Sequence, residues 1–260
     1  MTDPHPISPS LPSTAGGTPR FLFDHIPKSA GSSIHASLSE MFGHRLVTPI
    51  ILYESHRDSL RTCCHFTVIA GHVTFEPGES LDPTRHYLTL LREPIDRVLS
   101  LYYFFRHSAA PIPEGTVNPI RQFNRQCREL ARALEVKEFM MSHDPAVCFH
   151  LDNFMTAHYS RLRCPPGKTC PSHEKLQAAS DVLRRYAIVG TYDRIPRFLK
   201  AVGNMAGLPA VETIPRLNQT GLRPVMSETA TDVLRIIAGR NSMDQELYAH
   251  WSKLAADAAG

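Results

Sequence analysis

Short apolar runs alternate with longer amphipathic segments along this chain of 260 residues. A short apolar run bounded by turn residues predicts a buried strand, whereas apolar residues at every third or fourth position predict a helix. The strands expected on this basis are 20–26, 46–53, 66–70, 86–91 and 187–190. The expected helices are 32–42, 94–105, a mostly helical stretch over 116–160, and then 173–186, 193–205, 228–239 and 242–257. Strands that alternate with helices predict an α/β fold with a central, mostly parallel sheet flanked by helices.

The first 18 residues differ from the rest of the chain in composition. They are rich in Pro, Ser and Gly, so we expect residues 1–18 to form a disordered tail and residues 19–260 to form a single domain. The tail lacks the basic start and apolar stretch of a secretion signal. Because the chain has no run of about 18 apolar residues, we expect no membrane span and a cytoplasmic protein. The oligomeric state stays open.

Charge and cysteine content narrow the classes of ligand. The formal net charge is +3, which suits an anionic ligand but lacks the concentrated basic face expected of a nucleic-acid-binding protein. Cys164 and Cys170 flank a Pro/Gly-rich loop that a disulfide could close, although a reducing compartment disfavours this. Zinc is disfavoured because His173 is the only histidine nearby and a second CxxC-type pair is missing from the sequence.

The most informative segment is Phe21–Ile34, which reads FLFDHIPKSAGSSI. An apolar run breaks at Pro27, Lys28 follows, and five small residues precede a return to helical spacing. This order is typical of a strand, a tight phosphate-binding loop and a helix, because small side chains let backbone N–H groups and a helix N-terminus approach an anion. Lys28 adds a mobile cation. The segment therefore predicts a ligand that carries phosphate.

Three of the expected strands end in residues suited to an anion site. These ends are Pro27-Lys28, Gly71-His72 and Arg92-Glu93. Because ligands of open α/β sheets bind at the carboxyl ends of the strands, we expect these three ends to converge on one crevice.

The loop does not match that of a nucleoside triphosphatase. A Walker loop ends in GK[ST], where the hydroxyl binds Mg²⁺, but here the lysine comes first. The strand YLTLL ends in Arg92 and not in a metal-binding acid, and the GKT at 167–169 lies in a proline-rich loop without a preceding strand. A metal-dependent phosphoryl transferase would therefore lack its metal ligands, and we expect no metal.

Several motifs resemble those of sulfotransferases. HIPKSAGSSI (25–34) resembles the 5′-phosphosulfate loop of that family, and LREPIDRVLSLYY (91–103) resembles its second signature, whose arginine and serine bind the 3′-phosphate of the donor. AGHVTF (70–75) resembles the GHxxF segment of the Golgi carbohydrate 2-O-sulfotransferases and their bacterial relatives, which carries a proposed catalytic histidine.

Two later segments extend the resemblance. DNFMTAHYS (152–160) resembles a DNxxTRxLSG segment of bacterial members, with Ala157 and Arg161 in place of the usual arginine and final glycine. IVGTYDRIPRFL (188–199), followed by RLNQTGLR (216–223), resembles the VGxxExF helix and the loop that covers the nucleotide.

This resemblance implies a P-loop-NTPase-like sulfotransferase fold and a donor, 3′-phosphoadenosine-5′-phosphosulfate (PAPS), that leaves as 3′-phosphoadenosine-5′-phosphate (PAP). It implies transfer to an acceptor hydroxyl, on a carbohydrate, and a bacterial origin. Lys28 and His72 would be catalytic, and His72 and Asn153 would contact the acceptor. The donor-binding residues implied are Lys28, Ser29, Ala30, Gly31, Ser32, Ser33, Arg92, Ser100, Arg216, Asn218 and Arg223.

Sulfuryl transfer by in-line displacement needs a group to bind the leaving phosphate, a group to stabilise charge, and a base for the acceptor hydroxyl. The loop donors and the Lys28 ammonium suit the first two needs. His72 suits the third, because an imidazole with a near-neutral pKa is an effective general base; His25, beside the loop, is the rival base. Non-catalytic roles also stay open for two of these residues. His72 could have a purely structural role, and Arg92 could form an ion pair with Glu93 and not bind phosphate.

Two other functions also stay open. One is a nucleotide-dependent kinase or NTPase, which the lysine-first loop disfavours. The other is a non-catalytic module that binds a phosphonucleotide, which the presence of both Lys28 and His72 disfavours.

Overall fold

A computed structural model of the chain describes residues 18–108, 119–162, 172–209, 211, 213–215, 217 and 223–257. Four sequence predictions lie outside these residues. They concern the tail over 1–17, the Cys164–Cys170 pair, and the donor-binding roles of Arg216 and Asn218.

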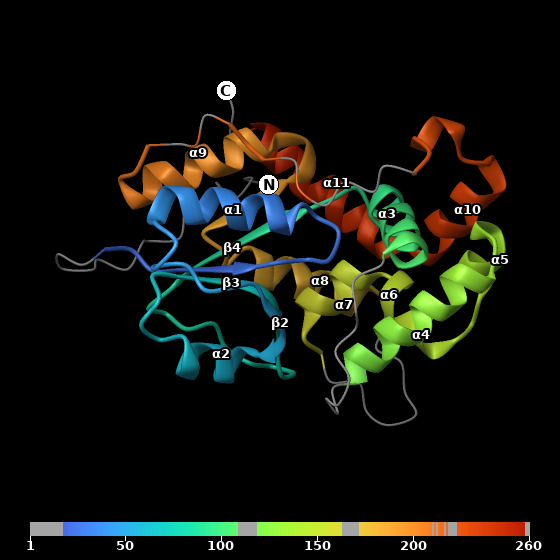
Figure 1. The fold of residues 1–260 in the computed structure, drawn as a ribbon, viewed down its shortest axis with the longest axis horizontal. Helices are drawn as coiled ribbons and strands as arrows, with labels where there is room; N and C mark the ends of the chain where they lie inside the picture. Colours follow the sequence, from blue (N-terminus) through green and yellow to red (C-terminus); the bar gives the residue numbers. More distant parts are fainter. Residues whose placement is uncertain are drawn as a thin grey trace, which may run out of the picture.

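The described chain forms an α/β fold around a five-stranded, all-parallel sheet, as the sequence predicts (Figure 1). The strand order is β2-β3-β1-β4-β5. The strands are β1 (Phe21–Asp24), β2 (Ile51–Ser55), β3 (Val68–Thr74), β4 (His86–Leu91) and β5 (Ile188–Thr191). Because β1 lies between β3 and β4, the ends of these three strands share one edge of the sheet, where an open α/β sheet places its ligands.

Most helices follow the predicted segments closely in the first and last thirds of the chain, but the helix over 56–62 was not predicted. The helices are α1 (Gly31–Phe42), α2 (His56–Thr62), α3 (Pro94–His107), α4 (Pro119–Ala133), α5 (Val136–Met141), α6 (Pro145–Leu151), α7 (Phe154–Ser160), α8 (Ser172–Leu183), α9 (Ile195–Ala206), α10 (Thr231–Arg240) and α11 (Ser242–Asp257). Two short 3-10 helices, η1 (Tyr192–Arg194) and η2 (Met226–Glu228), precede α9 and α10. The stretch expected to be mostly helical over 116–160 contains four separate helices in its described part.

The predicted strand boundaries around β2 and β3 were wrong. β2 begins at Ile51 and not at residue 46, because Pro49 has no N–H for a strand ladder, and upstream only Val47 forms an isolated bridge, to Val68. β3 does not end at Gly71 but continues to Thr74 beside β2. Gly71 permits this, since a Cβ there would lie 2.3 Å from the carbonyl oxygen of Ile51.

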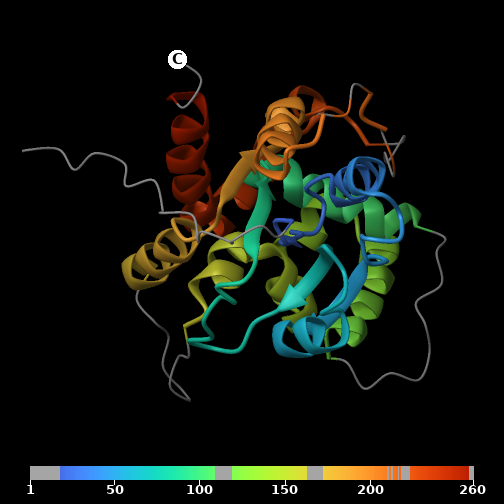
Figure 2. The same ribbon diagram turned by 90° about the vertical axis from the view of Figure 1, so that its left-hand side faces the viewer.

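Buried apolar side chains of the described residues form three clusters. One joins the sheet to α1 and α9, and a second joins its other face to α7, α8 and α11. The third lies among α3, α4, α5, α6 and α10, beside the sheet (Figure 1). Figure 2 shows α9 (orange) and α1 (blue) in the upper part of the molecule and α8 (gold) at its left. Each face of the sheet is thus covered by helices.

In the part of the chain that the structure describes, no helix combines the length and the apolar character that crossing a bilayer requires.

Candidate functional site

The loop between β1 and α1 has an unusual backbone. Lys28 and Ala30 have φ angles of 68° and 59°, in the left-handed region that non-glycine residues seldom adopt and that costs about 1–3 kcal/mol. The N–H of Ser29 donates to the carbonyl of Ile26 at 3.2 Å, which closes the turn. The Oγ of Ser29 is buried and has no hydrogen-bond partner among the described residues. Strained backbone and an unpaired buried hydroxyl together mark the loop as a binding-site candidate.

His25 forms the floor of this loop. Its ring lies where a side chain at Gly31 would be, because a Cβ built on Gly31 would fall 1.8 Å from the His25 Cε1 and Nε2 atoms. Only a residue without a side chain fits there, so α1 begins directly above the imidazole. Burial holds the pKa of His25 well below its usual range, so His25 is neutral at pH 7. Its position suits support of the loop better than a role as the rival base.

Lys28 faces aromatic and cationic neighbours. Its Nζ lies 4.1 Å from the centre of the Phe104 ring, on α3. Burial, together with the charges of Arg92 and Arg223, lowers the pKa of Lys28 to about 8. Such a cation gains from an added anion, because a negative ligand would offset the repulsion from both arginines.

Arg92 joins the second motif to the loop. Its Nη1 donates to the carbonyl of Lys28 at 2.6 Å, and its Nε donates to Asp96 Oδ2 at 2.6 Å. The guanidinium also lies 4.2 Å from the centre of the Tyr192 ring. The ion pair considered with Glu93 is wrong: Glu93 instead accepts from the Ile95 and Asp96 N–H groups and caps α3.

Arg223 meets the same carboxylate. Its Nη2 pairs with Asp96 Oδ1, and its Nη1 donates to the backbone carbonyl of Asp96 at 3.2 Å. Leu217, the other described residue of the expected covering segment, donates its N–H to Ser33 Oγ at 3.1 Å. The two described residues of this segment therefore contact α1 and α3. Ser100 lies farther along α3 and is buried.

His72 lies beside the loop, in β3. Its Nδ1 is 2.6 Å from the carbonyl oxygen of His25. Since a carbonyl only accepts, Nδ1 carries the proton and Nε2 keeps its lone pair. Burial lowers the pKa of His72 to about 4, which corrects the near-neutral value expected from the sequence. The imidazole is thus neutral at pH 7 and able to accept a proton.

Asp24, which the sequence analysis did not single out, is the fully buried last residue of β1. Its carboxylate accepts from the Tyr186 hydroxyl at 2.6 Å and from His158 Nε2 at 3.0 Å. Although burial alone would raise the pKa of Asp24, His158, Tyr186 and the charge of Arg161 hold it below its usual value. In the sequence, the signal for Asp24 was an acidic residue directly before the loop. The residues that bind its carboxylate lie far along the chain, between positions 158 and 186.

Asn153 has a structural role at the starts of two helices. Its Oδ1 accepts from the N–H groups of Met243 and Asp244 at 2.8 and 3.1 Å, at the start of α11. In return, the Asp244 carboxylate accepts from the Met155 and Thr156 N–H groups at the start of α7. The two side chains cap each other's helices, so Asn153 Oδ1 is engaged within the fold, and its contact with an acceptor stays a prediction.

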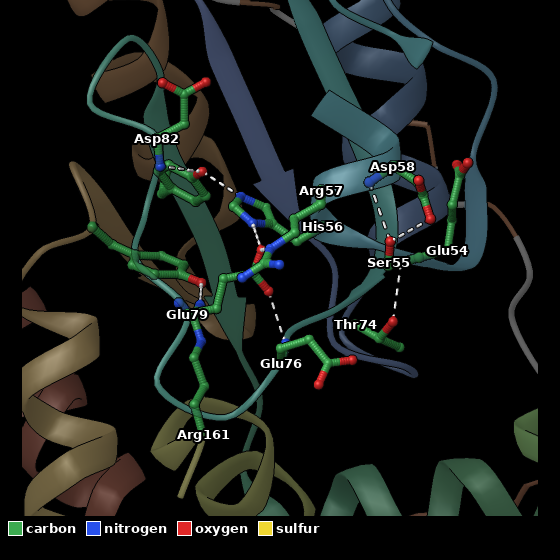
Figure 3. A network of polar contacts seen from close by, with 12 residues as sticks. Glu54, Ser55, His56, Arg57, Asp58, Thr74, Glu76, Glu79, Asp82 and Arg161 are labelled. Carbon is green, nitrogen blue, oxygen red and sulfur yellow. Dashed lines mark hydrogen bonds and ion pairs between the residues drawn. The ribbon is translucent and has the colours of Figure 1, made fainter. Parts of the chain in front are cut away.

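A second polar network surrounds the carboxyl end of β2 (Figure 3). His56 lies between Glu79 Oε1 at 2.9 Å and the Tyr87 hydroxyl at 2.6 Å, and this holds the chain after β3 against α2. Beside it lies a surface cavity of about 490 Å³, lined by Ser55, Arg57, Asp58, Glu76, Pro77 and Glu79. Its carboxylates outnumber its one cation, so the cavity does not suit a phosphate.

Within the described residues, no group of three or more histidine, cysteine, aspartate or glutamate side chains is arranged to hold a metal ion. Neither a scan against models of protein families nor a search of curated proteins finds a match to this chain.

Proposed function

We propose that this chain is a sulfotransferase that moves a sulfuryl group from PAPS to an acceptor hydroxyl. One observation carries the proposal: Arg92 donates to the carbonyl of Lys28 at 2.6 Å. The two segments that resemble the donor-binding signatures of sulfotransferases, far apart in sequence, are thus in direct contact at the carboxyl ends of β1 and β4.

A second contact supports the same family. Arg161 stands where bacterial members usually have glycine, and its φ of 48° is in the left-handed region that glycine adopts without strain. Its guanidinium lies 3.5 Å from the centre of the Phe75 ring, the phenylalanine of the GHxxF-like segment. The finer proposals are a P-loop-like sulfotransferase fold and a carbohydrate acceptor, in a cytoplasmic bacterial protein.

The roles proposed for the residues follow from their surroundings. Lys28, Arg92 and Arg223 provide three cations, two of which pair with the carboxylate of Asp96, and this suits a ligand with two phosphate-type groups. The start of α1 and the buried Ser29 hydroxyl add donors at the loop. In the reaction the bond from sulfur to the leaving phosphate breaks, a bond to the acceptor oxygen forms, and the hydroxyl proton passes to Nε2 of His72.

A transfer assay tests the proposal. Radiolabelled PAPS is incubated with pools of glycans, lipids and small alcohols, and label in the acceptors is counted. We expect transfer by the native chain and by two control variants at exposed positions, Lys200→Ala and His44→Ala. Lys28→Ala and His72→Ala should abolish it. Near-normal turnover by the His72→Ala variant would contradict the role of His72 as the general base. A chain that binds PAPS without transferring label to any pool would favour the non-catalytic module.

A further inference from the structure

Strand β2 contains a bulge next to His72. In the register with β3, Leu52 pairs with His72 and Glu54 pairs with Val73, so that Tyr53 is an extra residue. Its φ is 59°, a left-handed conformation that is rare for an aromatic residue and costs about 1–3 kcal/mol. Bulges re-aim side chains, and this one turns the Tyr53 ring towards β3.

The re-aimed ring packs on the imidazole of His72. The two ring centres are 5.1 Å apart and the planes differ by 14°. On its other side, His72 stacks on His25 at 4.2 Å, and His25 in turn stacks on Phe23 at 5.8 Å. The imidazole is therefore held between two rings, while its Nδ1 is fixed by the His25 carbonyl. Rotation of His72 would require Tyr53 to move.

The hydroxyl of Tyr53 is anchored in turn. The side chain of Asn124, on α4, forms a hydrogen bond with it, and burial raises the pKa of the phenol, so the hydroxyl stays neutral. The helix of Asn124, α4, contributes to the apolar cluster beside the sheet. The contact thus links that cluster to the ring that covers His72.

We propose that Tyr53 is a positioning residue that holds the His72 imidazole in the single orientation in which Nδ1 is bonded to His25 and Nε2 is left to accept a proton. The orientation of His72 by Tyr53 follows from the geometry alone, whereas its effect on catalysis rests on the proposed function. The strain of the bulge then has a purpose, because an unbulged strand would direct residue 53 to the opposite face of the sheet.

Two substitutions separate the ring from the hydroxyl. Tyr53→Phe keeps the stack and loses the contact with Asn124, whereas Tyr53→Leu removes the stack. Nuclear magnetic resonance follows the titration of His72, on which Asp24, His158 and Lys28 also act. In Tyr53→Leu we expect the pKa of His72 to rise by about one pH unit or more as water reaches the ring. In Tyr53→Phe we expect it to stay near its native value.

The same variants are compared in the transfer assay. We expect Tyr53→Leu to lower kcat on the order of 10²-fold, since a misplaced catalytic group costs about that much, with the KM for PAPS and the Kd for PAP unchanged. Tyr53→Phe should retain most of the native rate. Tyr248→Leu, on α11, is the control and should change neither kcat nor the His72 titration.

Some results would overturn the inference. One is a native His72 titration together with a native kcat in folded Tyr53→Leu. Another is a fall in kcat in Tyr53→Phe as large as in Tyr53→Leu, since the hydroxyl and not the stack would then matter. If Tyr53→Leu fails to fold, Tyr53→Met is used, which fills the site without a ring. If the native chain transfers nothing, the proposed function fails, and the titration still decides whether Tyr53 holds His72.

Discussion

The imidazole of His25 occupies the space that a side chain at position 31 would need, with a Cβ on Gly31 only 1.8 Å from two of its ring atoms. For Gly31→Ala we therefore expect a loss of about 3 kcal/mol in the free energy of unfolding, because an overpacked site must move backbone or ring. We also expect weaker binding of PAP, since the loop and the start of α1 would shift. Urea denaturation and calorimetry measure the two effects.

Gly239→Ala is the matched control. Gly239 lies within α10 with open space where the Cβ would be, so alanine there should stabilise the chain by about 0.5–1 kcal/mol. PAP binding should not change. A Gly31→Ala chain as stable as the native one, with native affinity, would show that the contact with His25 does not constrain the loop.

The lowered pKa of Lys28 predicts a pH-dependent affinity. Lys28 is charged below a pH of about 8 and neutral above it, and an anionic ligand binds the charged form better. The Kd for PAP should therefore rise as the pH increases from 8 to 9.5, by up to about tenfold per pH unit. Calorimetric titration at several pH values measures this. Lys28→Arg should give a flat profile over the same range, and a flat native profile would argue against Lys28 as a ligand of the anion.

Acid should destabilise the fold through its buried histidines. Burial lowers the pKa of His72 to about 4 and that of His150 to about 3, and it also lowers that of His25. Below pH 6.5 the unfolded chain binds protons at these positions and the folded chain does not, so stability falls as the pH drops towards 4. Each such histidine adds about 1.4 kcal/mol per pH unit to the slope.

Urea denaturation between pH 7 and 4.5 measures this slope. His150→Phe removes one of the three groups and should make the slope shallower, whereas His44→Ala, at an exposed position, should leave it unchanged. A stability that stays constant from pH 7 to 4.5 would contradict the burial of neutral imidazoles.

Asn153 offers a test of a structural against a substrate-binding role. Asn153→Ala removes a cap from α11 and should lower the free energy of unfolding by about 1 kcal/mol, with no change in the KM for the acceptor. Asp244→Ala should lower the free energy of unfolding by about 3–5 kcal/mol, because it also leaves the buried guanidinium of Arg97 without the opposite charge of Asp244. A raised acceptor KM in a stable Asn153→Ala chain would support the substrate-binding role.

Local sequence patterns predicted the parts of the fold that depend on neighbouring residues. The strand over 86–91 was placed at its observed bounds, and the convergence of the ends of β1, β3 and β4 followed from the fold class. Lys28 and Arg92 could be singled out because each belongs to a continuous motif, and the contact between them lies at the expected edge of the sheet.

Features that depend on distant partners could not be predicted. The helix-capping role of Asn153 needs Asp244, and the low pKa of His72 needs burial between His25 and Tyr53. Tyr53 itself looked like an ordinary strand residue, because a bulge is set by the pairing of two strands and not by the sequence of one. The role of Asp24 could not be predicted either, because it depends on hydrogen bonds from Tyr186 and His158, which are distant in the sequence.

Calorimetric titration of the native chain with PAP and, separately, with ATP and Mg²⁺ tests the central claim most directly. We expect PAP to bind more tightly than ATP and without Mg²⁺. Lys28→Ala should weaken PAP binding by about tenfold or more, as expected for a lost charge-assisted contact, whereas Lys200→Ala should bind PAP as the native chain does. Tighter binding of ATP with Mg²⁺ than of PAP would contradict the sulfotransferase proposal.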